Sequence, residues 1–506
     1  MLKYRHTLHL PVLYQCYRVA IHVDCTKGTN WHLGTNLARD CPRRGGLDFV
    51  ASKLPSLQFF EGLAVEGKMS DGQISQKLWI ATFLTATPSF VFGFALAALN
   101  SCLVTGGGNS ETKCFNSDDD DSDPCPIGTI YNDLDLNSTK AQVATALGIL
   151  GAWCGSLAGS KPSDRYGRKW TLLVNNVPIM LGAILTSVGD EYCLYVGRFI
   201  LGLGVGVGSV VAPVLLSEIA HKDNAGTITS IHQLMITLAI FLVAILAYGF
   251  VTYVSHGWQY VQAFVVIPCA LMIVGSDHMY ESPKWLVERN RKEEAKQVIS
   301  ALRVDDHDVD GELDSLQLEN KDNGANEEVS WTEVFVYQHG VIVGCGMMSI
   351  CALTGINTVI FYSTTIFGFA GFHEAILATS SVGLVNFAAT FVATKFTDKW
   401  GRKFLVMTGT SIMLVALLML SAVLAFGNDD EQTQGYFAVF ATLLYVVGFS
   451  CGLGPVSWVI MSEMLPTRVR TKAYGLFLSI NWFWNLCIGL LTLTAIDGLG
   501  GVTDSV

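Results

Sequence analysis

Long apolar runs separated by short polar segments recur along the chain from residue 78 onward. Most of these runs reach the roughly 20 residues with which an α-helix crosses the hydrocarbon core of a bilayer, and the shorter sixth run is extended through its flanks. The eleven runs lie at residues 78–104, 141–159, 170–188, 199–216, 228–254, 261–273, 341–370, 375–394, 404–426, 436–461 and 475–495. The pattern predicts an all-α membrane protein with eleven visible spans.

Composition and charge agree with this interpretation. Hydrophobic residues make up 51% of the chain, charged residues make up 15%, and the mean hydropathy is +0.41. Although the net charge is -11, Lys and Arg gather in the segments that follow even-numbered spans. The positive-inside rule predicts that these segments and the N-terminus are cytoplasmic. We therefore expect a multi-pass integral membrane protein of the plasma membrane. Its expected partner is the lipid bilayer and not nucleic acid, and the sequence does not define the oligomeric state.

Two sequence patterns occur twice, at matching places along the chain. "DRYGRK" at 164–169 follows the second span, and "DKWGRK" at 398–403 follows the eighth. "APVLLSEIA" at 212–220 closes the fourth span, and "GPVSWVIMSEM" at 454–464 closes the tenth. The chain is therefore interpreted as two similar halves in tandem.

The repeat defines four predicted regions. Residues 1–75 contain no apolar run long enough to span a membrane, so we expect them to form a cytoplasmic extension. Residues 76–279 are expected to form the first bundle, with spans one to six. Residues 280–331 combine helical periodicity and charge with a polar linker, which predicts a cytoplasmic helical insert. Residues 332–506 form the second bundle, in which only spans seven to eleven are visible. We expect the missing twelfth span to reflect a truncated sequence.

Several motifs follow one another in a specific order and spacing. They are "DRYGRK", "VGRFILGLGVGVGS", "PVLLSEI", "HQL", "ESPKWL", "GINTVIFYSTTIF", "DKWGRK" and "GPVSWVIMSEMLPTRVR". From about residue 79 to residue 494 the chain thereby resembles the sugar porter family of the major facilitator superfamily, and within it the facilitative hexose transporters. The resemblance implies the major facilitator fold, in which two pseudo-symmetric helical bundles hold a substrate between them near the middle of the membrane.

Charged residues at the predicted cytoplasmic rim form a candidate latch between the halves. Opposite charges there can pair across the halves, hold the outward-facing state and separate when the carrier opens inward. The alternative is the positive-inside rule alone, which requires Lys and Arg but not carboxylates at matching places. The candidates are Asp164, Arg165, Arg168 and Glu218 in the first half, and Asp398, Arg402, Glu463 and Arg470 in the second.

Polar side chains inside the spans are candidates for binding a sugar. Amides donate to and accept from adjacent hydroxyl groups, and aromatic rings cover the C–H faces of a sugar. The candidates are Gln233, Asn357, Asn386, Asn481 and Asn485, with Trp458 and Trp482 as aromatic walls and Tyr362 as an outer gate. All of the amides and tryptophans lie where the family places its sugar-contacting or pocket-lining residues. Intramembrane amides also join helices, and this alternative carries most weight for Asn481 and Asn485.

Arg198 lies inside an apolar run, "YVGRFILGLG". A charge at such a position costs about 2.5 to 3.5 kcal/mol unless it is paired or faces the bundle interior, so we expect it to face inward. The glycines that follow it predict close helix packing rather than a phosphate-binding loop, since no soluble strand precedes them.

The chain departs from the family pattern at positions that bear on substrate and energy coupling. The family usually has two glutamines before "GIN", where this chain has Cys351 and Ala352, and it usually has a second proline where this chain has Ser457. Each lost hydrogen bond would cost about 1 to 3 kcal/mol, which predicts weak hexose binding or a different substrate. Proton symporters of the family carry an aspartate in the first span, where this chain has Ala95.

The sequence thus favours a facilitative uniporter of hexose or a related polyol that works by alternating access. The alternatives are a transport-inactive sugar sensor and a proton-coupled sugar or polyol symporter that uses another acidic residue. No arrangement of histidines and carboxylates suits catalysis, and no nucleotide-binding or metal-ligand motif is visible. We therefore expect no enzyme activity, cofactor or metal.

Overall fold

The computed structural model describes residues 75–102, 128–134, 136, 138–304, 307–322, 330–360, 375–426 and 431–503. Residues 72–506 form one compact unit. The described residues form helices and connecting turns, with no strand among them, which confirms the predicted all-α class. Tyr362 and the predicted extension up to residue 74 lie outside the described residues.

The six apolar runs of the first half all fall on helices. The first run is divided between α4 (Gln76–Thr85) and α5 (Thr87–Cys102), and the sixth between α11 (Gly257–Ala263) and α12 (Val266–Val274). Between them lie α6 (Ile130–Leu134), α7 (Ser138–Tyr166), α8 (Arg168–Thr186), α9 (Glu191–Ile219), the short η1 (Lys222–Asn224) and α10 (Ala225–Tyr253), and η2 (Gly275–His278) closes this half.

The second half repeats this organisation. It contains α16 (Trp331–Val336), α17 (Gln338–Leu353), α19 (Ala375–Trp400), α20 (Arg402–Phe426), α21 (Glu431–Cys451), α22 (Leu453–Glu463) and α23 (Thr467–Thr503), and residues 356–360 are also helical. The tenth predicted run is thus divided between α21 and α22.

Nine stretches of the described residues are long and apolar enough to cross a membrane. They are Gln76–Cys102, Thr139–Tyr166, Glu191–Ile219, Lys222–Tyr253, Gly257–His278, Gln338–Ile360, Arg402–Ala422, Tyr436–Glu463 and Arg468–Leu490. The two predicted spans outside this set, α8 and α19, lie alongside the others in the same bundle.

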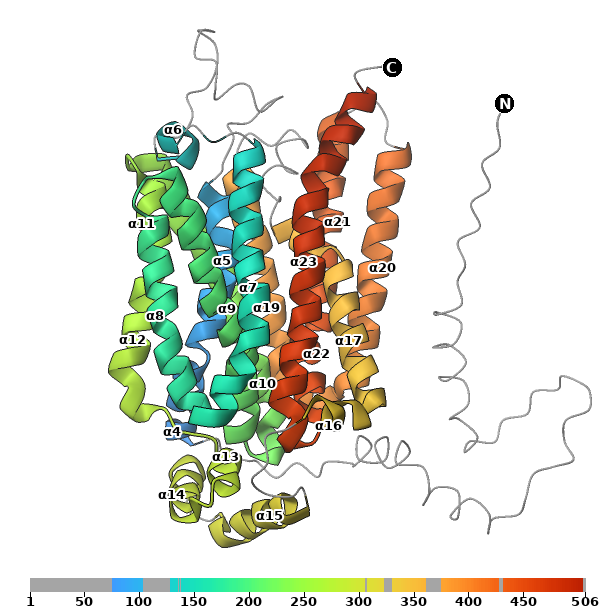
Figure 1. Cartoon of the computed structure of the whole chain (residues 1–506). Helices are drawn as coiled ribbons and strands as arrows, with labels where there is room; N and C mark the ends of the chain where they lie inside the picture. The colour runs from blue at the N-terminus through green and yellow to red at the C-terminus, as the bar shows by residue number, and fades with distance from the viewer. Residues whose placement is uncertain are drawn as a thin grey trace, which may run out of the picture. The chain divides into compact units, whose positions relative to one another are not determined.

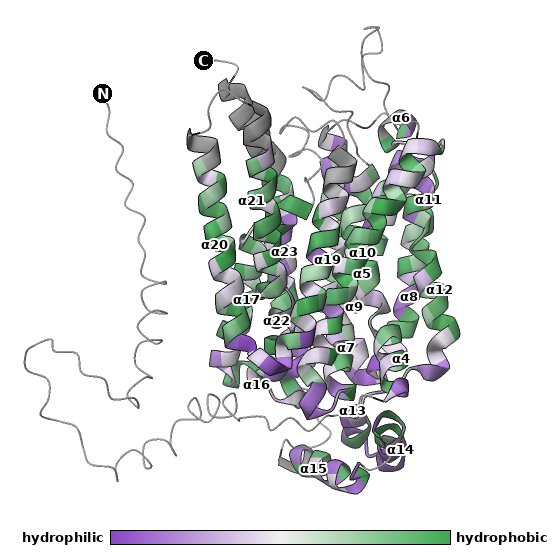
Figure 2. Ribbon diagram, turned by 180° about the vertical axis from the view of Figure 1, so that it is seen from behind, coloured by the Kyte–Doolittle hydropathy of each residue, from purple (hydrophilic) through white to green (hydrophobic). Residues whose placement is uncertain are grey.

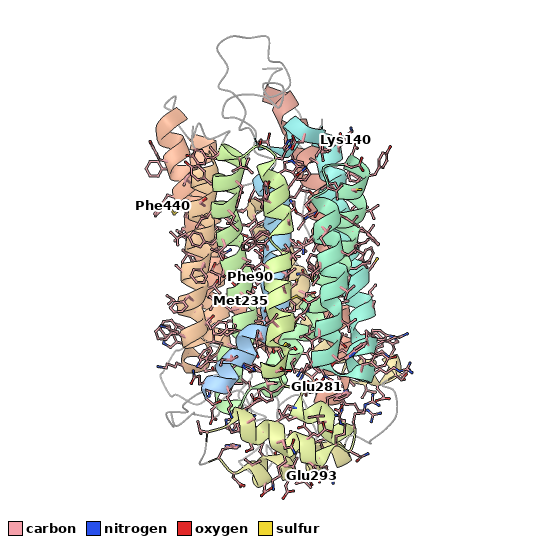
Figure 3. All side chains as sticks on the ribbon, turned by 90° about the vertical axis from the view of Figure 1, so that its left-hand side faces the viewer. Phe90, Lys140, Met235, Glu281, Glu293 and Phe440 are labelled. Carbon is pink, nitrogen blue, oxygen red and sulfur yellow. The ribbon has the colours of Figure 1, made fainter. Side chains whose placement is uncertain are left out.

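The long helices run side by side, with the first half on one side of Figure 1 and the second half on the other. The halves meet where α7 packs on α23 and where α10 packs on α19 and α22. Apolar residues predominate along the helices in Figure 2, whereas polar residues gather at the end next to α13, α14 and α15. In Figure 3, Lys140 lies at one end of the bundle, and Glu281 and Glu293 lie toward the other.

The glycines that follow Arg198 allow α7 and α9 to pack in close contact. A Cβ atom added to Gly202 would lie 2.2 Å from the backbone oxygen of Gly148, and one added to Gly206 would lie 2.1 Å from that of Ala152. Since Cβ atoms do not approach backbone oxygens so closely, only glycine fits at these positions. The predicted role of these glycines in helix packing is confirmed.

The segment between the halves, here called the insert, contains α13 (Pro283–Glu288), α14 (Lys292–Leu302) and α15 (Val309–Asp322). Trp285, Ile299 and Leu313 belong to a small apolar core of its own. Trp285 also donates its indole N–H to the backbone oxygen of Asp164, over 2.9 Å. The insert is therefore attached to the last turn of α7, and the end of the bundle where α7 ends and α8 begins is called the insert end below.

Candidate functional site

An amide and an indole from opposite halves meet inside the bundle. Gln233 of α10 accepts a hydrogen bond from the indole N–H of Trp458 in α22, over 2.8 Å, and both side chains are buried. The His232 ring lies 4.3 Å from the Trp458 ring, and its Nδ1 is 2.6 Å from the hydroxyl of Ser89 in α5. The Nε2 group of Gln233 has no hydrogen-bond partner among the described residues, so it is available to a ligand.

Three predicted amides form a chain within the second half. Asn357 donates to the side-chain oxygen of Asn485, which in turn donates to the side-chain oxygen of Asn481 over 2.9 Å. The helix α17 ends before Gly355, whose φ of +85° is a left-handed conformation that suits glycine. The resulting break places Asn357 at the start of a new helical segment, beside α23.

Trp482 and Arg198 line a cavity of about 20 Å³ between the first-half helices and α23. The Trp482 ring lies 5.0 Å from the Phe92 ring of α5. Arg198 is buried and donates to the backbone oxygen of Ala95, over 3.0 Å. No acidic side chain of the described residues contacts its guanidinium group, which is therefore solvated by backbone carbonyls.

Asn386 lies apart from these groups. It is buried in α19 and accepts a hydrogen bond from Ser450 of α21, over 2.8 Å. No hydrogen bond joins it to the other predicted site residues in the described part of the chain. Its contacts match the alternative role of an amide that joins two helices.

Two of the positions at which the chain departs from the family pattern, Cys351 and Ser457, lie close together. Cys351 belongs to α17 and Ser457 to α22, and the hydroxyl of Ser457 donates to the backbone oxygen of Leu453. Ala352 is fully buried. The replacement of glutamine and of proline thus places a thiol near a hydroxyl directly before Trp458.

A second cluster lies at the insert end of the first half. Arg168 at the start of α8 pairs with Glu218 at the end of α9, over 3.1 Å, and their side chains are only 2% and 0% exposed. Arg168 also lies 3.6 Å from Asp164 and donates to the hydroxyl of Thr471 in α23, over 3.2 Å. Arg165 is exposed and lies over the ring of Tyr166, so it stands outside this cluster.

The second half contains the matching cluster. Arg402 at the start of α20 pairs with Glu463 over 2.6 Å and with Asp398 over 3.1 Å. Asp398 accepts hydrogen bonds from the backbone N–H and the hydroxyl of Thr227 in α10, over 2.8 and 2.6 Å.

The close ion pairs of these two clusters lie within each half in the described part of the chain, whereas the expected attraction across the halves stays a prediction. The halves are joined by hydrogen bonds that Thr227 donates to Asp398 and that Thr471 accepts from Arg168. A buried ion pair is costly to separate, whereas a single hydrogen bond to a charged group contributes about 1.5 to 3 kcal/mol. Contacts of this kind can break while every buried charge keeps its partner.

Arg470 fits this pattern only in part. It is buried in α23 and donates to the backbone oxygen of Leu465, over 3.1 Å, and it interacts electrostatically with Glu218 and Glu319. It therefore adds positive charge between the two clusters without forming a close ion pair to either of them. Sequence reasoning named none of the threonines, although Thr471 directly follows Arg470.

Glu288 of the insert gives this region a predicted pH dependence. Burial, helped by Glu218 and Asp164, raises its pKa to about 6, against the opposing effect of Arg168. The folded state therefore retains a proton that the unfolded chain releases, so stability increases as the pH falls toward 5. We expect Glu288→Gln to raise the melting temperature at pH 7.5 by about 1 to 3 °C and to reduce the difference between pH 7.5 and 5.5. Thermal unfolding of the purified protein at both pH values measures this.

Glu293→Gln is the matched control, because Glu293 is exposed on α14 of the same insert (Figure 3). It should leave both melting temperatures unchanged. A lower melting temperature for Glu288→Gln at pH 7.5 would contradict the prediction.

Comparisons with known proteins show the family of the chain. Residues 81–506 match the family model described as "Sugar (and other) transporter". Glucose transporter GlcP of Staphylococcus epidermidis is 34% identical over 352 residues, which cover 69% of this chain and 77% of GlcP. Plastidic glucose transporter 4 of Arabidopsis thaliana is 33% identical over 356 residues. These residues cover 70% of this chain and 64% of the plastidic protein. The family contains transporters rather than enzymes.

A solved structure has the same fold. The proton:xylose symporter XylE, bound to 6-bromo-6-deoxy-D-glucose, superposes with a TM-score of 0.69 at 22% identity. The superposition covers 85% of this chain and 91% of that one. The predicted major facilitator fold is confirmed.

Proposed function

Because the chain belongs to the sugar transporter family of the major facilitator superfamily, we propose that it is a facilitative hexose carrier of the plasma membrane. The observation that carries the proposal is the contact between Gln233 and Trp458, which joins α10 and α22 from opposite halves. A substrate bound there touches both halves, as alternating access requires.

The available groups suit a neutral polyhydroxylated substrate. Gln233 offers an unpaired N–H₂ group, and the indole of Trp458 offers an apolar face beside it. On the second half, Asn357, Asn481 and Asn485 satisfy one another in the absence of a ligand. Sugar hydroxyls can replace these amide contacts one for one, so binding leaves no buried polar group unpaired.

Uniport is supported by the surroundings of Arg198. Its guanidinium group donates to the backbone oxygen of Ala95, and no described carboxylate contacts it. A proton-coupled carrier needs a group that binds and releases a proton within the transport pathway. Ala95 occupies the place in which proton symporters of the family carry an aspartate, so the first span offers no such group.

The transport cycle follows from the contacts at the insert end. The hydrogen bonds of Thr227 to Asp398 and of Thr471 to Arg168 close that end. We propose that both break when the halves rock, while Arg168 keeps Glu218 and Arg402 keeps Glu463. The closed and open states then differ by a few hydrogen bonds, a difference that substrate binding can offset.

Uptake by proteoliposomes tests the proposal. We expect saturable uptake of labelled glucose, fructose or inositol that stops at the external concentration and is unchanged by an imposed pH gradient. Accumulation above the external concentration under a proton gradient would contradict uniport and favour the symporter. Sugar binding without any flux would contradict a carrier and favour the sensor.

A further inference from the structure

The fold brings together two histidines and a carboxylate that are far apart in the sequence. His221 follows α9 and precedes η1, whereas His307 and Glu312 belong to the insert, at the start of α15. One ligand atom from each of the three lies within 4.8 Å of the other two. The His221 and His307 rings meet edge to face, with their centroids 5.1 Å apart.

The three side chains have the donor chemistry of a transition-metal site. Two imidazoles and one carboxylate, with an open fourth position for water, form a ligand set that Zn²⁺ accepts in tetrahedral geometry. The surrounding groups also suit a metal, because metal-bound histidines and carboxylates are usually held by further hydrogen bonds. The backbone N–H of Asp223 donates to Nδ1 of His221 over 3.4 Å, and the Asp223 carboxylate lies 3.3 Å from the same atom, where it can accept a hydrogen bond from Nδ1–H when a metal occupies Nε2.

Glu312 retains capacity for a metal despite its other contacts. Arg303 donates to its two oxygens over 2.7 and 3.0 Å, and Nε2 of His307 lies 2.6 Å from one of them. A carboxylate offers about four lone-pair sites, so these contacts leave it unsaturated. A metal would replace the proton between His307 and Glu312, as metal binding to histidine normally does.

The distances require only small movements. Metal–ligand bonds of about 2.0 to 2.2 Å in a tetrahedral site separate the ligand atoms by roughly 3.3 Å. Nε2 of His307 lies 2.6 Å from an oxygen of Glu312, and the three ligand atoms all lie within 4.8 Å of one another. The side chains are 32%, 21% and 20% exposed for His221, His307 and Glu312, so they can rotate and an ion can reach them.

We propose that His221, His307 and Glu312 bind one Zn²⁺ or a chemically similar divalent transition-metal ion. The ion would attach the insert to the end of α9, where Arg303 already donates to the backbone oxygen of Ile219 over 2.9 Å. Because the folded state alone brings the three ligands together, the ion stabilises that state.

Calorimetric titration of the purified full-length protein with Zn²⁺ tests the site. The other histidines and cysteines of the chain can also bind metal, so the readout is the difference between variants. We expect His221→Ala and His307→Ala each to lose one equivalent of bound Zn²⁺ relative to the wild type. Asp223→Asn should retain that equivalent with about tenfold weaker affinity, as expected for a group that orients a ligand.

Two exposed histidines outside the cluster, His256 and His339, provide the controls. Their alanine variants should bind as many equivalents as the wild type, and melting temperatures without metal identify any variant that fails to fold. Titration with Co²⁺ adds a spectroscopic check, because tetrahedral Co²⁺ absorbs strongly in the visible range and His307→Gln should lose this absorption. Equal Zn²⁺ stoichiometry in the wild type, His221→Ala and His307→Ala would overturn the proposal, and so would a wild type that binds no Zn²⁺.

Discussion

Gln233→Ala is expected to raise the KM for sugar tenfold to a hundredfold. The substitution removes the N–H₂ group that is available to a ligand and also leaves the indole N–H of buried Trp458 without its acceptor. A polar group left unpaired in a buried site costs about 1 to 3 kcal/mol, and each 1.4 kcal/mol corresponds to a factor of ten in affinity. Concentration-dependent uptake into proteoliposomes measures the KM directly.

Gln262→Ala is the matched control, since Gln262 is also a buried glutamine of the first half but lies in α11, away from the second half. It should change protein stability more than KM. The pair of variants Gln233→Ala and Trp458→Phe, combined in a double-mutant cycle, separates their mutual hydrogen bond from contacts to sugar. An unchanged KM in Gln233→Ala would exclude Gln233 from the binding site.

The spans could be predicted from the sequence because burial in lipid leaves a simple signal. A helix that crosses a bilayer needs a long run of apolar residues, and all eleven predicted runs fall on helices as far as the structure describes them. The interruptions of two runs also had signals that the apolar pattern hides. Pro88 follows the break between α4 and α5, and Pro455 follows the break at Gly452 between α21 and α22. A proline cannot donate to the carbonyl four residues earlier, which favours a helix break before it.

The side-chain contacts between packed helices could not be predicted in the same way. Composition and repeats identify Arg168 and Asp398 as rim charges, but they do not show that each reaches a threonine of the opposite half. The contact between Cys351 and Ser457 likewise depends on how α17 packs against α22. Such contacts are set by the rotation and depth of packed helices, which apolar periodicity determines only coarsely.

The histidine cluster illustrates the same limit. His221 and His307 have no motif spacing, and the sequence alone indicated no metal ligands. They meet because α14 and α15 fold back against the end of α9, where Arg303 binds the backbone oxygen of Ile219.

Arg168→Met is expected to destabilise the closed insert end and to reduce sugar uptake more than tenfold. Glu218 would be left as an unpaired charge with a side chain that is 0% exposed. Removing one partner of a buried ion pair typically costs about 3 to 5 kcal/mol. The hydrogen bond between Arg168 and Thr471 of the other half is lost as well. When the insert end opens, water can reach Glu218, so the unpaired charge destabilises the open state less than the closed state. The equilibrium between the two states therefore shifts toward the open state.

Three further variants distinguish the latch from a general loss of stability. Arg165→Met removes the exposed neighbouring arginine and should leave melting temperature and uptake unchanged. Arg168→Met combined with Glu218→Gln removes the buried charge together with its partner, so it should recover most of the lost melting temperature. Thr471→Val keeps the ion pair and removes only the hydrogen bond of Arg168 to the other half, so it should alter uptake with little change in melting temperature. If Arg168→Met behaved like Arg165→Met, the buried pair would have no part in closing the carrier, and the positive-inside rule alone would explain the charges at the rim.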